Sequence, residues 1–130
     1  VIPRTNTPGA ADVDSHGFVD HQLFHCFPKT VQQRGKTFLN RINKVAQQRH
    51  QKTFIQLNYQ QQFELLTDVE AAKNGLNKKD KGAFKHLKGL IAFGYYTSEA
   101  GAKDELRYLP VPGGYKGSIK YTNNEGAWSN

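Results

Sequence analysis

Residues 28–49, PKTVQQRGKTFLNRINKVAQQR, contain the pattern that decides the fold. At 100° per residue, the apolar side chains of this stretch fall within about 120° of arc, which predicts a single core-facing stripe on a helix. The stripe consists of Val31, Phe38, Leu39, Ile42, Val45 and Ala46. The basic side chains on the opposite side are Lys29, Lys36, Arg41 and Lys44. Pro28 suits a first helical turn, so we predict a helix from Pro28 to about Arg49.

Two shorter helices are predicted on either side of this one. Ser15 is expected to cap a helix that ends near Phe27, because a residue that precedes proline avoids the helical conformation. Asn58 followed by Gln61 has the spacing of a capping box and predicts a helix over residues 59–73. Its apolar series is Phe63, Leu66, Val69 and Ala72. Asn74-Gly75 is expected to end this helix, since glycine readily takes the left-handed conformation of a helix cap.

The fourth predicted helix runs over residues 83–96, after a charged connector over residues 76–82. Its last turns, residues 90–96 (LIAFGYY), are apolar or aromatic all round, so we expect both faces to be covered. One face can pack on the chain's own core. The other face requires either the C-terminal tail or a second protein.

The predicted fold is therefore an all-α domain of about four main helices with an extended, irregular C-terminal arm. We expect a single domain over residues 1–130, because a chain of this length builds one modest core. Within it, residues 1–14 form a loop, 15–96 the helical core and 97–130 an arm rich in aromatic residues. The prolines of LPVPGGY (109–115) exclude a helix there.

The basic charge is concentrated in one third of the sequence. The chain has a net charge of +7, and no Asp or Glu occurs between His21 and Phe63. Such a segment can attract nucleic acid, an anionic membrane or an acidic protein, or can simply be a solvated helix face. A small basic helical nucleic-acid-binding module is the alternative function, although no zinc-finger, homeodomain or RNP signature is present.

Motifs for catalysis, cofactors or metals are weak in this sequence. His21 and His25 have a spacing that can chelate zinc, but Gln22 stands where the zinc-protease motif has its general base. Cys26 has no orienting acid nearby and is interpreted as a small buried hydrophobic residue. No glycine-rich phosphate loop follows a strand. We therefore expect no catalytic, cofactor-binding or metal-binding residue in this chain and no membrane-spanning segment.

Three segments resemble the gluconate 2-dehydrogenase subunit 3 family. They are IPRTNTPGA (2–10), LKGLIAFGYYTSEAGA (87–102) and ELRYLPVPG (105–113), followed by Ala127-Trp128. The middle helices are similar to the family only in pattern. One departure is Gly117-Ser118-Ile119-Lys120, where the family often has Cys and Pro, so any role of that cysteine is missing here.

The resemblance implies a small, non-catalytic subunit that binds, stabilises and helps to export a large flavoprotein. That partner is a glucose–methanol–choline-type dehydrogenase that holds FAD and oxidises a sugar, a sugar acid or a glycoside. It often passes electrons to a cytochrome c. The resemblance also implies a periplasmic location reached by twin-arginine export. Because the chain begins with Val1 and not with Met, we expect a processed or trimmed form. The sugar stays open.

The partner interface is predicted at the end of the fourth helix and in the arm, because large aromatic side chains dominate interface energies once they are desolvated. The candidate residues are Phe93, Gly94, Tyr95, Tyr96, Gly101, Leu106, Tyr108, Leu109, Pro110, Pro112, Tyr115 and Trp128. Gly94 and Gly101 would permit close backbone approach. A competing interpretation keeps the same aromatic residues inside the subunit, as a lid on its own core.

Overall fold

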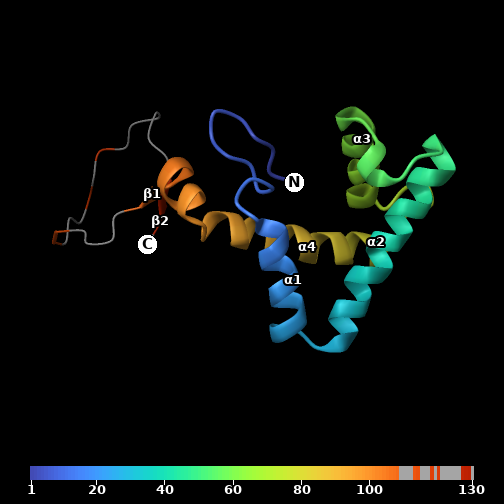
Figure 1. Ribbon diagram of the computed structural model, residues 1–130, viewed down its shortest axis with the longest axis horizontal. Helices are drawn as coiled ribbons and strands as arrows, with labels where there is room; N and C mark the ends of the chain where they lie inside the picture. Colours follow the sequence, from blue (N-terminus) through green and yellow to red (C-terminus); the bar gives the residue numbers. More distant parts are fainter. Residues whose placement is uncertain (109–112, 115–117, 119, 121–126, 130) are drawn as a thin grey trace. The chain divides into compact units, whose positions relative to one another are not determined.

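The chain is helical in the computed structural model, which describes residues 1–108, 113, 114, 118, 120 and 127–129 (Figure 1). This confirms the predicted all-α class with four main helices. The main helices are α1 (Ser15–Cys26), α2 (Lys29–His50), α3 (Tyr59–Ala71) and α4 (Lys78–Tyr96). The short elements are a 3-10 turn η1 (Phe54–Gln56), a π-helical turn η2 (Gly101–Glu105) and the strands β1 (Arg107–Tyr108) and β2 (Trp128–Ser129). The two strands pair in parallel, with Arg107 opposite Trp128.

The chain forms two compact units. The first unit consists of residues 1–18 and 91–130, and the second consists of residues 19–90. α1 and α4 each contribute one end to each unit. The single-domain organisation stays a prediction.

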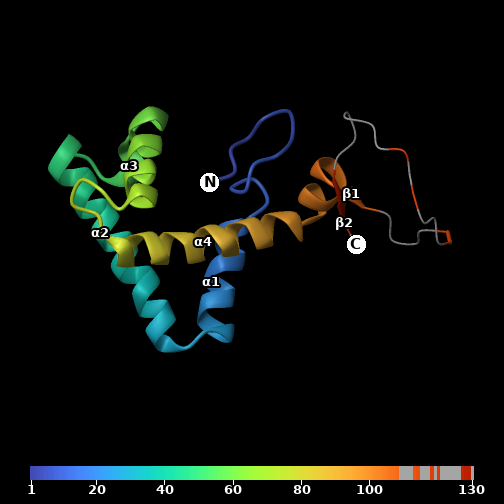
Figure 2. The same cartoon turned by 180° about the vertical axis from the view of Figure 1, so that it is seen from behind.

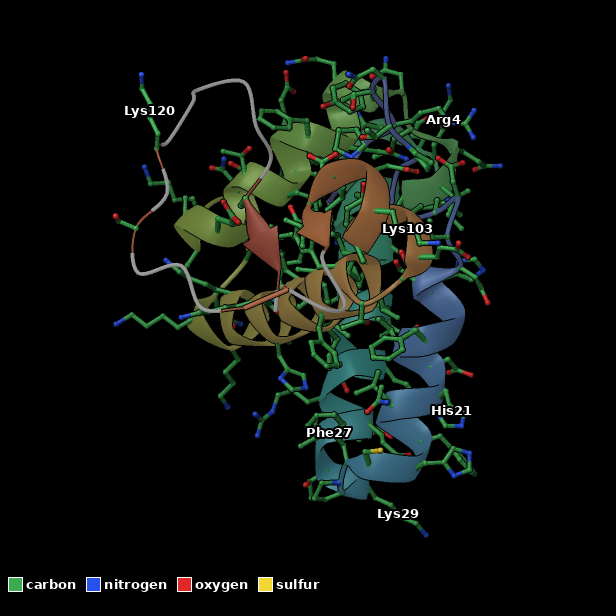
Figure 3. The ribbon with its side chains drawn as sticks, turned by 90° about the vertical axis from the view of Figure 1, so that its left-hand side faces the viewer. Arg4, His21, Phe27, Lys29, Lys103 and Lys120 are labelled. Atoms are coloured by element: carbon green, nitrogen blue, oxygen red, sulfur yellow. The ribbon has the colours of Figure 1, made fainter. Side chains whose placement is uncertain are left out.

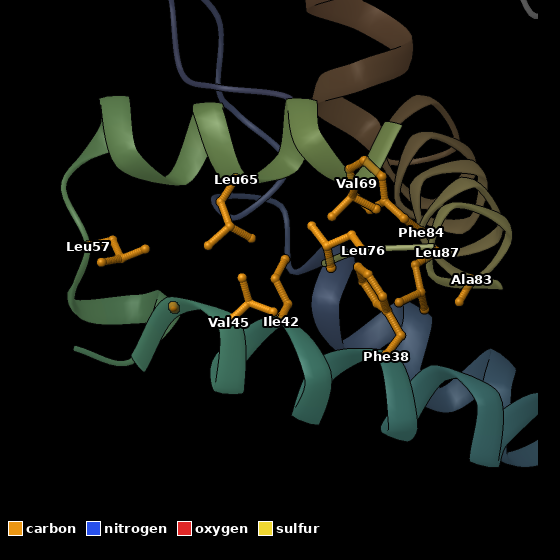
Figure 4. Close-up of a cluster of buried hydrophobic side chains, with 11 residues drawn as sticks. Phe38, Ile42, Val45, Leu57, Leu65, Val69, Leu76, Ala83, Phe84 and Leu87 are labelled. Carbon is orange, nitrogen blue, oxygen red and sulfur yellow. The ribbon is translucent and has the colours of Figure 1, made fainter. Parts of the chain in front are cut away.

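The core of the second unit is built from α2, α3 and the first half of α4. In both ribbon views α3 lies beside α2 (Figures 1 and 2), and Figure 4 shows Leu65 and Val69 of α3 facing Ile42 and Val45 of α2. The rings of Phe38 and Phe84 lie 5.9 Å apart. The buried cluster comprises Phe38, Ile42, Val45, Ala46, Leu57, Leu65, Val69, Leu76, Ala83, Phe84 and Leu87.

The predicted stripe on α2 is confirmed for four of its residues, Phe38, Ile42, Val45 and Ala46, which are all buried. Val31 is only partly buried, and Leu39 is wrong as a core residue because 51% of it is exposed. Leu39 lies about 100° around the helix from Phe38, at the edge of the stripe, where the neighbouring helices no longer cover it. The predicted boundaries of α2 agree with the structure within one residue at each end.

The start of α4 corrects the sequence prediction. Residues 76–82 are not a connector, because the helix begins at Lys78. The Asn77 side chain accepts hydrogen bonds from the amides of Lys79 (2.8 Å) and Asp80 (3.1 Å). The Asp80 carboxylate in turn accepts from the amide of Asn77 (2.8 Å). This reciprocal capping satisfies helix amides that would otherwise lack partners, so the charged segment can be helical.

The ends of α3 and the start of α1 show one confirmed cap and two corrections. The capping box of Asn58 and Gln61 is present as predicted. However, α3 ends at Ala71, and Ala72 rather than Gly75 takes the left-handed cap conformation. Similarly, Asp14 rather than Ser15 caps α1, since the Asp14 carboxylate accepts from the amide of Gly17 (3.3 Å).

The buried face of α3 is turned around the helix axis relative to the predicted apolar face. Leu65 and Val69 are buried, whereas Phe63 is exposed and Leu66 and Ala72 are only partly buried. Polar contacts hold both ends of α3, and near its C-terminal end Asp68 accepts a hydrogen bond from Arg49 (2.7 Å).

In the described part of the chain, no helix combines the length and the apolar character that crossing a membrane requires.

Candidate partner interface

The first unit is organised around Tyr95, near the end of α4. Only 1% of Tyr95 is exposed, and its hydroxyl donates a hydrogen bond to the carbonyl oxygen of Pro8 at 2.8 Å. The N-terminal loop therefore covers this side chain. The ring and the hydroxyl of Tyr95 are used within the chain, and its role as an anchor for a partner stays a prediction. The burial of Tyr95 favours the competing interpretation of a side chain that packs inside its own subunit.

The two glycines near Tyr95 allow close approach within the same unit. A Cβ atom at Gly94 would lie 2.5 Å from Cδ1 of Phe18, and a Cβ atom at Gly101 would overlap the carbonyl oxygen of Tyr95. Both glycines are buried. The turn after α4 is held by Ser98, whose hydroxyl donates to the Tyr95 carbonyl (2.6 Å) and accepts from the Gly101 amide (3.2 Å). The predicted close approach is therefore made by the chain itself.

Two predicted interface residues, Phe93 and Tyr96, remain open to solvent. Phe93 is 59% exposed and Tyr96 is 41% exposed. Residues three apart lie on neighbouring positions of a helix surface, so these two side chains, called the α4 aromatic pair below, can act together. Their inner edges are fixed by ring contacts, since Phe93 lies 5.7 Å from Phe18 and Tyr96 lies edge-on to Tyr95 at 5.1 Å.

The remaining predicted interface residues follow η2. Leu106 is partly buried. Tyr108 and Trp128 belong to β1 and β2, so the two ends of the arm meet in one short backbone pairing. Leu109, Pro110, Pro112 and Tyr115 lie outside the described residues.

The N-terminal loop that covers Tyr95 is held in place by an ion pair and hydrogen bonds. Arg4 and Asp12 form an ion pair. The hydrogen bond from Arg4 and the bond from the Gly9 amide (2.8 Å) lower the pKa of the Asp12 carboxyl below its ordinary value. The Thr7 hydroxyl donates to the Glu105 carboxylate at 2.7 Å, which links the loop to η2. The loop is therefore a fixed part of the first unit.

The histidines and the cysteine of α1 form no metal centre in the described residues, where no group of three or more His, Cys, Asp or Glu side chains could hold an ion. The rings of His21 and His25 pack against each other at 4.4 Å. Cys26 is exposed, so the prediction that it is a buried hydrophobic residue is wrong. Figure 3 shows His21 on α1, and Phe27 and Lys29 at the turn into α2.

Part of the basic segment has a structural role. Arg41 pairs with the buried Asp80 at 2.9 Å and also donates to the Gly75 carbonyl at 2.7 Å. Arg49 pairs with Asp68 and donates to the Asn74 carbonyl at 2.7 Å. Arg41 therefore connects α2 to the start of α4, and Arg49 connects α2 to the end of α3. The charge pattern alone does not reveal these connections.

A second exposed apolar surface, which was not predicted from the sequence, lies at η1 and the start of α3. The residues are Ile55, Tyr59 and Phe63, and all three are exposed. The rings of Tyr59 and Phe63 stack with their centroids 6.3 Å apart. The four-residue spacing of two aromatic residues on a predicted helix was a usable signal for this surface.

The sequence model described as gluconate 2-dehydrogenase subunit 3 matches residues 1–113 of the 130-residue chain. The chain belongs to this family. This match confirms the resemblance seen in the sequence. Members of the gluconate 2-dehydrogenase subunit 3 family are subunits of a dehydrogenase complex. Searches of curated proteins and of solved structures found no match. The family match covers Tyr95, its covering loop and the α4 aromatic pair.

Proposed function

We propose that this gluconate 2-dehydrogenase subunit 3 protein is the non-catalytic small subunit of a FAD-dependent sugar dehydrogenase. Its large partner is a flavoprotein of the glucose–methanol–choline type, which binds FAD and oxidises a sugar, a sugar acid or a glycoside. The small subunit binds and stabilises this partner and assists its export. The family match supports the role as a subunit.

The exposed α4 aromatic pair is the observation that carries the proposed docking. Phe93 and Tyr96 are held by ring contacts to Phe18 and Tyr95 while most of Phe93 and much of Tyr96 face solvent. A fixed aromatic side chain loses little conformational freedom when it binds, and its large apolar area makes it a strong contributor to binding energy. The pair therefore suits a preformed contact with the large subunit.

Purification through a tag on this chain from the native host tests the proposal. We expect a larger polypeptide to co-purify, with a flavin absorbance band and sugar-dependent reduction of an artificial electron acceptor. A haem band in the same preparation would add the proposed cytochrome c subunit. The isolated chain is expected to lack both the flavin band and the activity. A flavin bound to the isolated chain, or purification without any oxidoreductase, would contradict the proposal.

The proposed export role places the complex in the periplasm by the twin-arginine route. That route carries folded proteins, and in this family the small subunit typically carries the export signal. A large subunit without its own signal can therefore be exported while bound to the small subunit. Deletion of this chain from the host is expected to remove the large subunit from the periplasm, and re-expression should restore it. Normal periplasmic amounts of an active large subunit in the deletion strain would refute the export role.

A further inference from the structure

A small pocket with both apolar and polar lining lies within the second unit, between the end of α1, the start of α2 and the first half of α4. It encloses about 270 Å³. Its apolar walls are Leu23, Phe27, Val31, Ala83 and Leu87. The polar side chains at the pocket are Arg34 and His86, and the backbone at Gly35 and Gly82 completes the lining.

The pocket is held open by fixed neighbours. The His86 ring packs edge-on against Phe27 with centroids 5.0 Å apart. The Gln32 side chain donates to the carbonyl of Phe27 at 3.1 Å, which fixes the turn from α1 into α2. A Cβ atom at Gly82 would meet nothing within 4 Å, so no side chain of the described residues fills this edge of the pocket. The pocket is therefore a preformed feature of the second unit.

The size of the pocket limits what it can hold. Sites for drug-sized ligands and cofactors usually enclose about 300–1,000 Å³. A pocket of about 270 Å³ lies just below this range and has room for one inserted side chain. The apolar walls favour an aromatic or branched aliphatic side chain, because burial of its apolar surface against them lowers the free energy of binding.

The second unit as a whole is strongly basic, and Arg34 belongs to the pocket lining. Residues 19–90 contain thirteen Lys and Arg residues against five Asp and Glu residues, a net charge of +8. Three of these five carboxylates are already paired with cations, in Arg41–Asp80, Arg49–Asp68 and Lys88–Glu70. Within the part of the chain that the structure describes, no carboxylate pairs with Arg34, which is exposed. The pocket therefore favours an occupant that carries negative charge.

We infer that this pocket is a second docking site for the large flavoprotein subunit, distinct from the α4 aromatic pair. The occupant is a surface segment of that subunit with one aromatic or branched aliphatic side chain flanked by carboxylates. The side chain enters between Phe27 and Leu87, and a carboxylate meets Arg34. This inference rests on the proposed function, because the partner is the same flavoprotein.

Charge complementarity together with the apolar walls favours a protein over a nucleic acid. A nucleic acid would use the cations but would gain nothing from a pocket of one side chain's size, since its affinity comes chiefly from phosphate contacts. An acidic protein segment uses both features. Opposite charges across such an interface also speed up association and make it sensitive to salt.

Two substitutions test the pocket in the full-length chain, each with a matched control. Gly82→Leu places a side chain at the open edge of the pocket, and leucine is a better helix former than glycine, so the fold is kept. Its control is Gly89→Leu, at another open α4 glycine that does not line the pocket. Arg34→Glu reverses the charge at the pocket. Its control is Lys36→Glu, an exposed residue on the same helix that does not line it.

Binding of each variant to the purified FAD-containing large subunit is measured by titration calorimetry at two salt concentrations, after nuclease treatment. Circular dichroism checks that each variant is folded. We expect Gly82→Leu and Arg34→Glu each to weaken binding about tenfold or more, a change worth about 1.4 kcal/mol. The two controls should stay within about twofold of the parent chain. Arg34→Glu should also reduce the salt dependence of binding.

The outcomes separate this inference from the proposed function. If the parent chain binds the flavoprotein and Gly82→Leu and Arg34→Glu bind equally well, the pocket is not a docking site, while the proposed function stands. If the parent chain does not bind the flavoprotein at all, both are overturned. Binding that disappears after nuclease treatment would assign the basic surface to nucleic acid and would also overturn the inference. If Gly82→Leu does not fold, the comparison of Arg34→Glu with its control Lys36→Glu decides alone, because both residues are exposed.

Discussion

Alanine substitution of the two neighbouring tyrosines at the end of α4 should lower the stability of the chain by very different amounts. Tyr95 is buried and Tyr96 is 41% exposed, although the two are adjacent in sequence. Truncation of a buried aromatic side chain typically costs about 3–5 kcal/mol, so Tyr95→Ala should strongly destabilise the isolated chain. Tyr96→Ala removes mainly one edge-on ring contact, worth about 0.5–1.5 kcal/mol.

The hydroxyl of Tyr95 can be tested separately from its ring. Tyr95→Phe keeps the ring and removes only the hydrogen bond to the Pro8 carbonyl. We expect a loss of about 0.5–1.5 kcal/mol, the usual net contribution of one such bond. The free energy of unfolding is measured by urea denaturation followed by circular dichroism, with the three variants and the parent chain side by side.

Partner binding should show the reverse order. Tyr96→Ala is expected to weaken binding to the large subunit while leaving the isolated chain almost as stable as the parent. Tyr95→Phe, which changes nothing on the surface, should bind like the parent. If Tyr95→Ala proved as stable as Tyr96→Ala, the internal role that the structure gives to Tyr95 would be refuted.

Other substitutions test backbone packing and ionisation. Gly101→Ala should destabilise the chain, because its Cβ atom would overlap the Tyr95 carbonyl oxygen, whereas Gly89→Ala, which meets nothing within 4 Å, should stabilise it by about 0.5–1 kcal/mol in thermal unfolding. The hydrogen bond from Asn74, the largest of several causes, lowers the pKa of the Asp68 carboxyl. The unfolded chain therefore binds this proton more tightly, so the stability from Asp68 is present above about pH 4 and is lost as the pH falls through the lowered folded pKa. Stability measured across acid pH should fall less steeply in Asp68→Asn than in the parent, and equal slopes would contradict this assignment.

The helices could be predicted from the sequence wherever periodicity and caps agreed. The stripe of α2 located Phe38 and Ile42 in the core, and the spacing of Asn58 and Gln61 located the start of α3. The start of α4 was missed because its lysines gave residues 76–82 the composition of a connector. The same Asn-x-x-Asp spacing that caps α4, from Asn77 to Asp80, was the signal that could have found it.

The candidate interface could be predicted only in part, because a sequence does not show what covers an apolar surface. The aromatic run at the end of α4 predicted that both faces are covered, and among the residues that the structure describes only the side of Tyr95 is covered. It could not show that the loop around Pro8 covers Tyr95 while Phe93 stays exposed. The pocket was also beyond sequence reasoning, since its walls come from three helices that only the fold brings together.

Native mass spectrometry of the complex, purified through a tag on this chain, tests the central claim most directly. We predict an assembly that contains this chain, one larger polypeptide and one FAD. Gentle dissociation should release this chain without the flavin, because FAD belongs to the partner. Recovery of this chain alone, as a self-assembly or with the flavin still bound to it would contradict the account.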